Sequence, residues 1–410
     1  MNENQNIPKL RFEGFTEPWE QRKLSELCSF DKGRGYSKSD LREDGTPIFL
    51  YGRMYTQYQT CVTSVDTFVE PQDNSLYSRG NEVVVPASGE TAEEIAVASS
   101  IRSPGIILGG DLNVLTACEV LNPDFLALGI SHGQPHYDLA RLAQGKTIVH
   151  VHNDDIAQLC FAYPSLAEQE QIARSILQLD SLINLHQRRY ERLRRLKQAL
   201  LRKMFPKPGE QVPELRFEGF TEPWKERKLG ELYVRAGSGG TPSSGDPRYY
   251  GGHIPFLGIA DMDGRFITKT EKSLTDDGLS NSAAWIVPAG SISLAMYASV
   301  GKVGITCCDM ATSQAFYNMV FDSTVTRDFV YSRLDRADCL SEWRSLISTG
   351  TQSNLNAQKV RDWAVAMPSL PEQHAIGSLF RELDDFITLQ QRKYERLQHL
   401  KQALLRKMFI

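Results

Sequence analysis

The sequence lacks the long apolar runs and the paired cysteines that mark membrane-spanning or secreted proteins. No apolar run approaches the roughly 18 residues that span a bilayer, and the N-terminus does not resemble a secretory leader. The seven cysteines are odd in number and form no C-x-x-C pair. We therefore expect a reduced, cytosolic compartment, with most thiols acting as small core residues.

A strong net charge is also missing. The 46 basic residues stand against 50 acidic ones, which gives a net charge of −4. Bulk electrostatic attraction alone is thus a poor basis for holding nucleic acid. The basic residues are unevenly distributed, however. Residues 187–207 carry nine Lys and Arg against Glu191 alone, and residues 391–410 carry six against Glu395 alone. These stretches are either solvated helix flanks or surfaces for DNA phosphates or an acidic partner.

No complete enzyme motif is present. The stretch ARLAQGKT (residues 140–147) matches a loose P-loop pattern, but a helix-like stretch precedes it and the β-like TIVHVH follows it. A P-loop needs the opposite order, a strand and then a helix, so that backbone amides can surround phosphates. NPDF (residues 122–125) lacks the second proline of the adenine-methyltransferase loop N-P-P-[YF]. We expect no catalytic residues and no cofactor on this chain.

Two histidine pairs have spacings that suit a metal ion. They are His132 with His136 and His150 with His152, but no cysteine or carboxylate completes either set convincingly. We interpret them as satisfied or surface histidines, with DNA contact as the next alternative, and we expect no metal.

The chain is organised around a duplicated frame. Residues 164–205 return as residues 368–409 with 26 of 42 positions identical, and PKLRFEGFTEPWEQRKLSEL (8–27) returns at 213–232 with 16 of 20 identical. We call each copy of the shorter repeat a clip and expect its Phe and Trp residues to anchor it (Phe12, Phe15, Trp19; Phe217, Phe220, Trp224). Each longer repeat opens with the S-x-x-E spacing of a helix capping box, at Ser165 with Glu168 and at Ser369 with Glu372.

Apolar residues in the longer repeats recur at alternating steps of three and four, as in a coiled coil. A helix of about 40 residues is about 60 Å long. We predict that the two helices pair antiparallel through a seam that includes Ile176, Leu179, Ile183, Tyr190 and Leu193 of the first copy and Phe380, Leu383, Ile387, Tyr394 and Leu397 of the second.

Polar residues interrupt the seam at His186, Gln390, Lys197 and Lys401. They are either tolerated in a wet coil or lock the register. If Ile183 faces Leu404, then His186 faces Lys401 and Lys197 faces Gln390, but registers slipped by one or two heptads stay open. A second apolar line lies off the seam, and we expect part of it to pack on the globular parts or on another subunit (Leu182, Leu185, Leu196, Leu201; Phe386, Leu389, Leu400, Leu405).

These repeats predict an α+β architecture with pseudo-two-fold symmetry. Two mixed α/β domains (residues 1–163 and 213–367) alternate with the helices (164–205 and 368–410), and a linker at 206–212 joins the halves. Each domain holds an insert between its clip and its long helix, at residues 28–163 and 233–367, and the two inserts are not visibly alike. Both carry short β-type runs, such as EVVVPA at 82–87 and SISLAM at 291–296. Antiparallel helices would place the two domains at opposite ends of the pair, which suits an asymmetric, two-part target.

The inserts also contain residue types that read DNA grooves. Arg pairs with guanine edges, Asn and Gln pair with adenine edges, and glycine lets a loop approach the backbone closely. The same compositions occur in ordinary turns. Our candidates are Lys32, Arg34, Tyr36, Tyr51, Arg53, Tyr55, Gln57, Ser88, Glu90, Thr91, His150 and His152 in the first half, and Thr241, Tyr249, Tyr250, Tyr297, Ser313, Gln314, Gln352 and Asn354 in the second.

Together these features resemble the specificity subunits of type I restriction–modification enzymes. The resemblance rests on R-F-E-G-F-x-x-x-W and on P-S-L-x-E-Q before the long helix, both present twice. GSGGTPSSGDPRYYGGHIPF (237–256) looks like the start of the family's target recognition domain, and TGTQSNLNAQKV (349–360) looks like its end. The first insert departs from that pattern, because KTIVHVHNDDI (146–156) stands where the second motif would be expected.

The resemblance implies that each insert is a target recognition domain that reads one half of a bipartite double-stranded DNA site, with the helices as spacer. It implies two modification subunits that use S-adenosylmethionine to methylate adenine, and restriction subunits that use ATP and Mg. It also implies a bacterial cytoplasmic protein that reaches the nucleoid through DNA. Two other classes are weighed against it, an enzyme that uses the ARLAQGKT loop and a coiled-coil scaffold without a DNA role.

Overall fold

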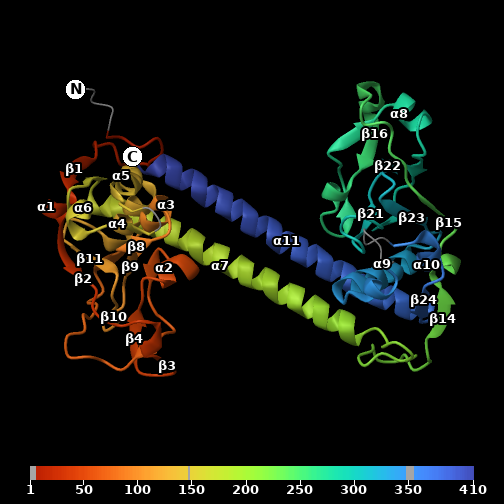
Figure 1. Ribbon diagram of the computed structural model, residues 1–410, viewed down its shortest axis with the longest axis horizontal. Helices are drawn as coiled ribbons and strands as arrows, with labels where there is room; N and C mark the ends of the chain where they lie inside the picture. Colours follow the sequence, from red (N-terminus) through yellow and green to blue (C-terminus); the bar gives the residue numbers. More distant parts are fainter. Residues whose placement is uncertain (1–5, 146–147, 348–354) are drawn as a thin grey trace. The chain divides into compact units, whose positions relative to one another are not determined.

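The computed structural model describes residues 6–145, 148–347 and 355–410. The chain divides into two compact units (Figure 1). Unit 1 comprises residues 1–185 with 394–410, and unit 2 comprises residues 186–393. Each unit therefore holds one insert and one segment from each of the two long helices, α7 (Leu166–Lys203) and α11 (Leu370–Met408).

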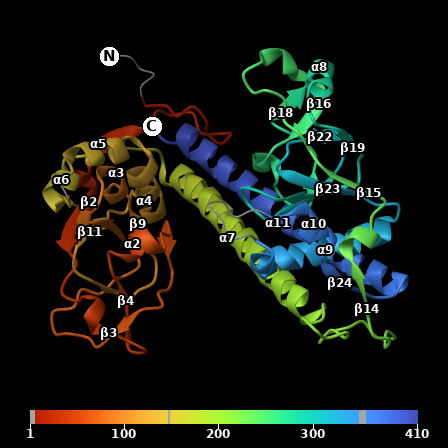
Figure 2. The ribbon, with the colours of Figure 1, turned by 45° about the vertical axis from the view of Figure 1, so that its right-hand side comes forward.

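Unit 1 is built on a five-stranded sheet of order β2-β11-β7-β9-β5, in which only the β9–β5 pair is parallel. The central strand β7 is EVVVP, and all five of its residues are buried, so the run of valines forms the core as expected. Helices α4 and α5 lie beside this sheet, and α4 packs on β7 and β9 (Figure 2). The bounds are β2 Cys28–Lys32, β11 Leu112–Ala117, β7 Glu82–Pro86, β9 Ser99–Ile101, β5 Cys61–Val62, α4 Pro123–His132 and α5 Gln134–Leu142.

Smaller elements complete unit 1. A four-stranded sheet has the order β10-β4-β6-β3, and β12 pairs with β8. The bounds are β3 Leu41–Arg42, β4 Thr46–Phe49, β6 Phe68–Val69, β10 Ile107–Leu108, β8 Ser88–Gly89, β12 Val149–His150, α1 Leu24–Leu27, α2 Arg53–Thr56, α3 Ala92–Ile95 and α6 Asn153–Ala157.

Unit 2 repeats the five-stranded sheet in the order β15-β23-β20-β21-β17, again with the last pair parallel. A four-stranded sheet of order β18-β16-β22-β19 accompanies it. The bounds are β15 Arg235–Ser238, β16 Tyr250–Leu257, β17 Phe266–Ile267, β18 Lys272–Leu274, β19 Ile286–Val287, β20 Ile292–Ala295, β21 Val303–Thr306, β22 Met310–Thr312, β23 Phe316–Val320, α8 Asp276–Ser280, α9 Thr324–Cys339 and α10 Ala357–Arg361.

The two clips have the same structure. In each unit the clip forms a short strand that pairs antiparallel with the strand just before a long helix, β1 (Glu20–Lys23) with β13 (Cys160–Tyr163) and β14 (Lys225–Lys228) with β24 (Ala364–Met367). Both tryptophans are buried, as predicted for anchors, whereas Phe217 is 36% exposed and is not one.

The long helices run antiparallel within each unit, which confirms the predicted pairing. In unit 1 the Leu10 amide donates to Lys407 beside the Arg11–Glu168 ion pair, while Asp180 binds Lys401 further along. In unit 2 His186 meets Gln390, and the rings of Phe205 and Phe380 lie 6.0 Å apart. All ten seam residues named above are buried or half-buried. Of the off-seam line, Leu201 and Leu405 are buried in the cores of their units, and Leu182, Leu196, Phe386, Leu389 and Leu400 are exposed.

The pairing of the interrupting residues differs from the register considered first. Lys401 binds Asp180 and Lys197 binds Asp384, each at 2.5 Å, while His186 is hydrogen-bonded to Gln390. The aspartates lie beside the apolar seam, so the seam pattern did not identify them as partners. The cysteines also differ from expectation. Cys28, Cys118 and Cys308 are half-buried and pack against the cores, but Cys160, Cys307 and Cys339 are exposed and are not core residues.

Candidate nucleic-acid interface

A frame of matched contacts supports the candidate loops of each unit. In unit 1, Arg11 binds both oxygens of Glu168 at 2.8 and 2.6 Å and donates to the Glu17 carbonyl. In unit 2, Arg216 binds Glu372 at 2.7 and 2.8 Å and donates to the Glu222 carbonyl. The two glutamates of the expected capping boxes thus hold the clips, and both are 1% exposed.

Aromatic rings form the same pattern in both frames. The rings of Trp19 and Phe125 are 5.6 Å apart with an interplanar angle of 67°, and those of Trp224 and Phe329 have the same separation and angle. The last phenylalanine of the opposite helix copy stacks on this pair, Phe409 on Phe125 at 5.3 Å and Phe205 on Phe329 at 5.5 Å. Both units therefore build their loops on the same rigid base.

Several first-half candidates lie together around α2 and β8. The rings of Tyr51 and Tyr55 are 6.4 Å apart, and the Tyr55 hydroxyl donates to the Ser88 carbonyl at 2.7 Å. Ser88 pairs with His150 across the β8–β12 ladder. Arg53 forms an ion pair with Asp66. Tyr51 and Tyr55 are each 37% exposed, so both rings remain accessible.

The remaining first-half candidates lie elsewhere in the unit or have structural roles. Lys32 ends β2, and Arg34 forms an ion pair with Asp31 at 3.4 Å. Tyr36 has a left-handed φ of 59°, and its hydroxyl binds Ser75 at 2.5 Å. Thr91 caps α3. His152 directly precedes α6, and its backbone amide donates to Asp155 at 2.9 Å. Gln57 and Glu90 are exposed.

In unit 2 the candidates gather where two segments cross. Thr241 is hydrogen-bonded to Gln314, and the Gly240 amide donates to the Thr312 carbonyl at 2.9 Å. A Cβ at Gly239 would lie 2.1 Å from the Thr312 carbonyl oxygen, so only glycine allows this approach. Ser313 lies in the same loop. The glycine-rich motif is therefore held directly against the loop that carries Gln314.

Tyrosines surround this crossing. The Tyr250 hydroxyl donates to the Pro242 carbonyl at 2.9 Å, and Tyr249 ends a short 3-10 turn beside Arg248. Tyr297 is 39% exposed and follows Met296, whose amide donates to Ala315. Gln352 and Asn354, with most of the TGTQSNL motif, lie outside the described residues.

The histidines do not form a metal site. Within residues 6–145, 148–347 and 355–410, no group of three or more His, Cys, Asp or Glu side chains could hold a metal ion. The His136 ring nitrogen contacts the Ala96 carbonyl at 2.7 Å. Burial lowers the pKa of His132 to about 4, and nearby Lys401 and His136 add to this effect. In the same described residues, no helix has the length and apolar character that crossing a membrane requires.

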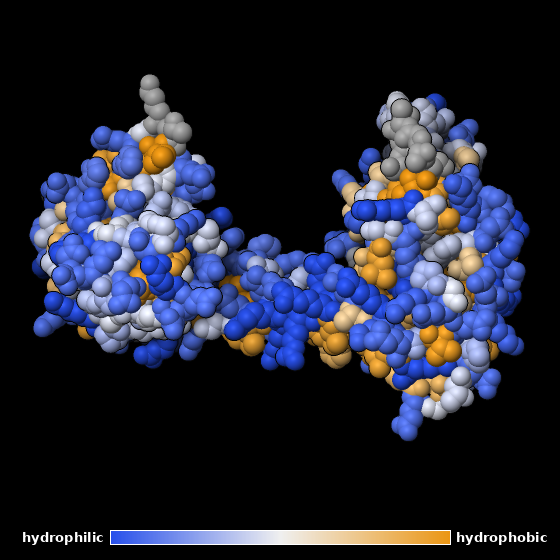
Figure 3. Space-filling view, turned by 60° about the horizontal axis from the view of Figure 1, so that its bottom comes forward, coloured by the Kyte–Doolittle hydropathy of each residue, from blue (hydrophilic) through white to orange (hydrophobic). Residues whose placement is uncertain are grey.

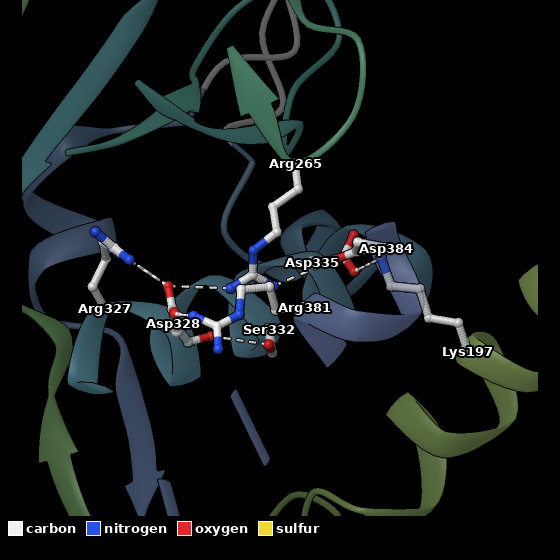
Figure 4. A network of polar contacts seen from close by, with 8 residues as sticks. All are labelled: Lys197, Arg265, Arg327, Asp328, Ser332, Asp335, Arg381 and Asp384. Atoms are coloured by element: carbon white, nitrogen blue, oxygen red, sulfur yellow. Dashed lines mark hydrogen bonds and ion pairs between the residues drawn. The ribbon is translucent and has the colours of Figure 1, made fainter. Parts of the chain in front are cut away.

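A buried ionic network in unit 2 was not predicted (Figure 4). Lys197 of α7 binds Asp335 of α9 at 2.6 Å and Asp384 of α11 at 2.5 Å. Arg265 reaches Asp384 at 3.3 Å and Asp328 at 3.2 Å. We call these five residues the Asp384 cluster. Burial alone would lower the pKa of Lys197, but Asp335 and Asp384 outweigh it and raise that pKa.

Unit 1 has a simpler group at the same place. Asp180 binds Lys401 at 2.5 Å and accepts from the Thr60 hydroxyl at 3.5 Å. Asp180 and Asp384 occupy equivalent positions of the two helix repeats, as do Lys197 and Lys401. Because the same Lys and Asp recur in both helices, the sequence alone could have indicated that they pair in each unit.

Both halves of the chain are similar to known proteins. The profile of the type I restriction modification DNA specificity domain matches residues 16–195 and again residues 221–399. The type I restriction enzyme MjaIX specificity subunit of Methanocaldococcus jannaschii is 28% identical over 191 residues, which are 46% of this chain and 44% of that protein. The match therefore spans less than half of that relative.

Two further comparisons extend over nearly the whole chain. The MjaVIII specificity subunit of the same organism is 20% identical over 403 residues, which cover 95% of this chain and 91% of that protein. The crystal structure of a type I restriction–modification S subunit from M. genitalium aligns with a TM-score of 0.68 at 16% identity, over 98% of this chain and 99% of that one. This likeness concerns the fold.

Proposed function

Because the chain belongs to the type I restriction modification DNA specificity family, we propose that it recognises the DNA sequence for a type I restriction–modification enzyme. The observation that carries the proposal is the double match to the family, over two segments that share a frame but differ in their loops. We propose no catalytic residue and no cofactor on this chain. S-adenosylmethionine, ATP and Mg belong to the partner subunits in this proposal.

Each unit reads one half of a bipartite, asymmetric DNA site in this proposal. The loops around Tyr51, Tyr55 and Ser88 read one half, and those around Thr241, Gln314 and Tyr297 read the other. Domain limits at 1–163 and 213–367, a linker at 206–212 and spacer helices at 164–205 and 368–410 go with this assignment. Different loops on matched frames support it, because an asymmetric site requires two unlike readers.

The partners include two modification subunits, with restriction subunits joining the assembly. Docking surfaces for the modification subunits are the exposed apolar residues of the helices, Leu182 and Leu400 in unit 1 and Leu196, Phe386 and Leu389 in unit 2. Phe386 is 53% exposed, and apolar areas appear among charged side chains on the helical surface (Figure 3). Exposed apolar side chains on a helix indicate a contact with another protein.

The test is to map methylated adenines in a host that expresses this chain with its modification subunit. We expect one bipartite sequence with an unspecified spacer. Replacing residues 28–163 with an unrelated insert should change only one half of that sequence, and a heptad inserted into both helices should change the spacer length. Methylation without a sequence preference, or an exchange that alters both halves, would contradict the proposal.

A chain that lacks exposed apolar residues of the helices tests the docking surface, and Glu170→Gln is its matched control. Leu182→Ser with Leu400→Ser should lower modification-subunit binding at least tenfold while the chain stays folded, because these side chains lie outside both cores. Glu170→Gln, a substitution of an exposed polar residue on α7, should leave binding unchanged.

A further inference from the structure

Arg265 links the five-stranded sheet of unit 2, which we call the recognition sheet, to the helices α9 and α11. It directly precedes β17, the edge strand of the five-stranded sheet, and its carbonyl accepts the Ile305 amide of β21 at 2.8 Å. Its side chain is only 1% exposed. The guanidinium reaches Asp384 of the long helix α11 and Asp328 of α9 (Figure 4).

The contacts of the Arg265 guanidinium also restrict its orientation. The guanidinium lies over the ring of Tyr331, 4.3 Å from the ring centre. Its Nη1 donates to Asp384 at 3.3 Å, and its Nη2 forms an ion pair with Asp328 at 3.2 Å. A planar guanidinium that stacks on a ring and binds two carboxylates has few alternative orientations, whereas a lysine ammonium would have many. A buried cation is tolerated only where such partners exist, so the contacts also require the sheet and helices to keep their spacing.

Unit 1 allows a direct comparison at the same position. Thr60 precedes the edge strand β5, and its carbonyl accepts the Ser100 amide of β9 at 2.8 Å, as Arg265 accepts Ile305. Its hydroxyl contacts Asp180, the counterpart of Asp384, at 3.5 Å. The same junction is therefore made by one long hydrogen bond from an uncharged hydroxyl in unit 1 and by a buried cation with two carboxylate partners in unit 2.

We infer that Arg265 is a positioning residue for the half-site read by unit 2. It fixes the angle at which the recognition sheet meets the helix pair, and thereby the placement of the reading loops on DNA. This inference rests on the proposed function. Arg265 itself is buried and contacts no DNA in this account.

The experiment compares Arg265→Thr, which installs the residue of unit 1, with the unchanged chain in complex with its modification subunits. The probes are a duplex with the mapped full site and two duplexes with one half scrambled. We expect Arg265→Thr to weaken binding to the full site about tenfold, which corresponds to about 1.4 kcal/mol. Binding to the duplex that lacks the half read by unit 2 should not change.

Arg327→Thr is the matched control. Arg327 binds Asp328 at 2.8 Å on the same helix α9, so its loss removes one cation beside the same carboxylate without cutting the link from the sheet to α11. Its effect on binding should stay within twofold. Arg265→Lys keeps the charge but lacks the planar guanidinium that lies over Tyr331. Its effect on binding should fall between those of Arg265→Thr and Arg327→Thr.

Hydrogen exchange on the free chain supplies a readout that needs no DNA. In Arg265→Thr, amides of residues 259–274 should exchange at least tenfold faster, while those of α9 and α11 keep their rates. Faster exchange throughout unit 2, equal losses in the two threonine variants, a loss on both halves, or unchanged binding would each overturn the inference. If the unchanged chain and its partners protect no bipartite site, the proposed function fails, and the exchange result still decides the role of Arg265 in the fold.

Discussion

The two units share their frame and differ at its polar centre. Both hold the clip with a buried Arg–Glu pair and stack a phenylalanine from the opposite helix copy on the same Trp–Phe pair. At the centre, unit 1 has Thr60, Ser131 and His132 where unit 2 has Arg265, Asp335 and Arg336. The last two pairs occupy equivalent helix positions after Phe125 and Phe329.

The same frame therefore accommodates uncharged side chains of the insert in unit 1 and charged ones at the equivalent positions in unit 2. Ser131 accepts the Ala98 amide and donates to the Ala127 carbonyl, while Asp335 binds Lys197. Arg336 donates to the Leu201 carbonyl at 3.0 Å and pairs with Glu342. The repeated clip and helices determine the position of this polar group, and the residues of each insert determine whether its side chains are charged. Four predictions test this comparison.

The largest effect concerns the shared frame. Phe125→Ala and Phe329→Ala should each lower the free energy of unfolding of their unit by about 4 kcal/mol, because each removes a fully buried ring from the same aromatic group. Hydrogen exchange resolved by unit measures both. Phe386→Ala, at an exposed position, is the control and should change stability little. Losses that differ by more than about 2 kcal/mol would break the likeness of the frames.

The next effect should separate the two centres. Lys197→Ala leaves Asp335 and Asp384 buried without their shared cation and should cost about 3 kcal/mol, whereas Lys401→Ala leaves only Asp180 and should cost about 1 kcal/mol. Denaturant titration of each variant measures the difference. Equal costs would mean that the extra carboxylate of unit 2 adds nothing to the pairing.

A smaller effect depends on pH and belongs to unit 1 alone. His132 has a folded pKa of about 4 because it is buried, and its ordinary value is 6.5. Between these values the unfolded chain binds the proton more tightly, so the contribution is present above about pH 6.5 and is lost as pH falls toward 4. We expect a loss of about 2 kcal/mol, measured as the difference between the unchanged chain and His132→Asn across that range.

Unit 2 has Arg336 at the position of His132, so it has no buried imidazole there. Unit 2 should therefore show no matching step when hydrogen exchange is followed from pH 7 to 4. A step of the same size in unit 2, or one that persists in His132→Asn, would assign the pH dependence to other groups.

The smallest effect refines the frame itself. Phe12 packs against the core of unit 1, but its counterpart Phe217 is 36% exposed. Phe12→Ala should cost about 1.5 kcal/mol and Phe217→Ala about 0.5 kcal/mol, in proportion to the apolar surface each side chain buries. Thermal unfolding of the two variants compares them, and a larger loss at Phe217 would reverse the assignment.

The sequence predicted the frame much better than the centre. Identical repeats indicated two equal clips and two antiparallel helices, because repeated residues make repeated contacts. The valine run at β7 and the short strand at β20 were also found, since buried strands have a strong apolar pattern.

The register of the helix pair and the polar centre depend on residues that the apolar pattern does not mark. Asp180 and Asp384 lie off the apolar seam. Arg265 meets Asp384 only after the sheet of unit 2 has folded onto α11. The candidate DNA contacts remain predictions. The structure brings Thr241 and Gln314 together but uses the hydroxyls of Tyr36, Tyr55 and Tyr250 inside the fold.

The Asp384 cluster also limits how such a reader can be exchanged between proteins. Arg265, Asp328 and Asp335 come from the insert, while Lys197 and Asp384 come from the repeated helices. A graft that carried only the surface loops, or that ended before α9, would strand one charge without its partners. The smallest part of unit 2 that keeps these contacts is therefore the whole stretch from Arg265 to the end of α9. In unit 1 the insert contributes the uncharged Thr60 to the Asp180–Lys401 pair, so a shorter graft would strand no charge there.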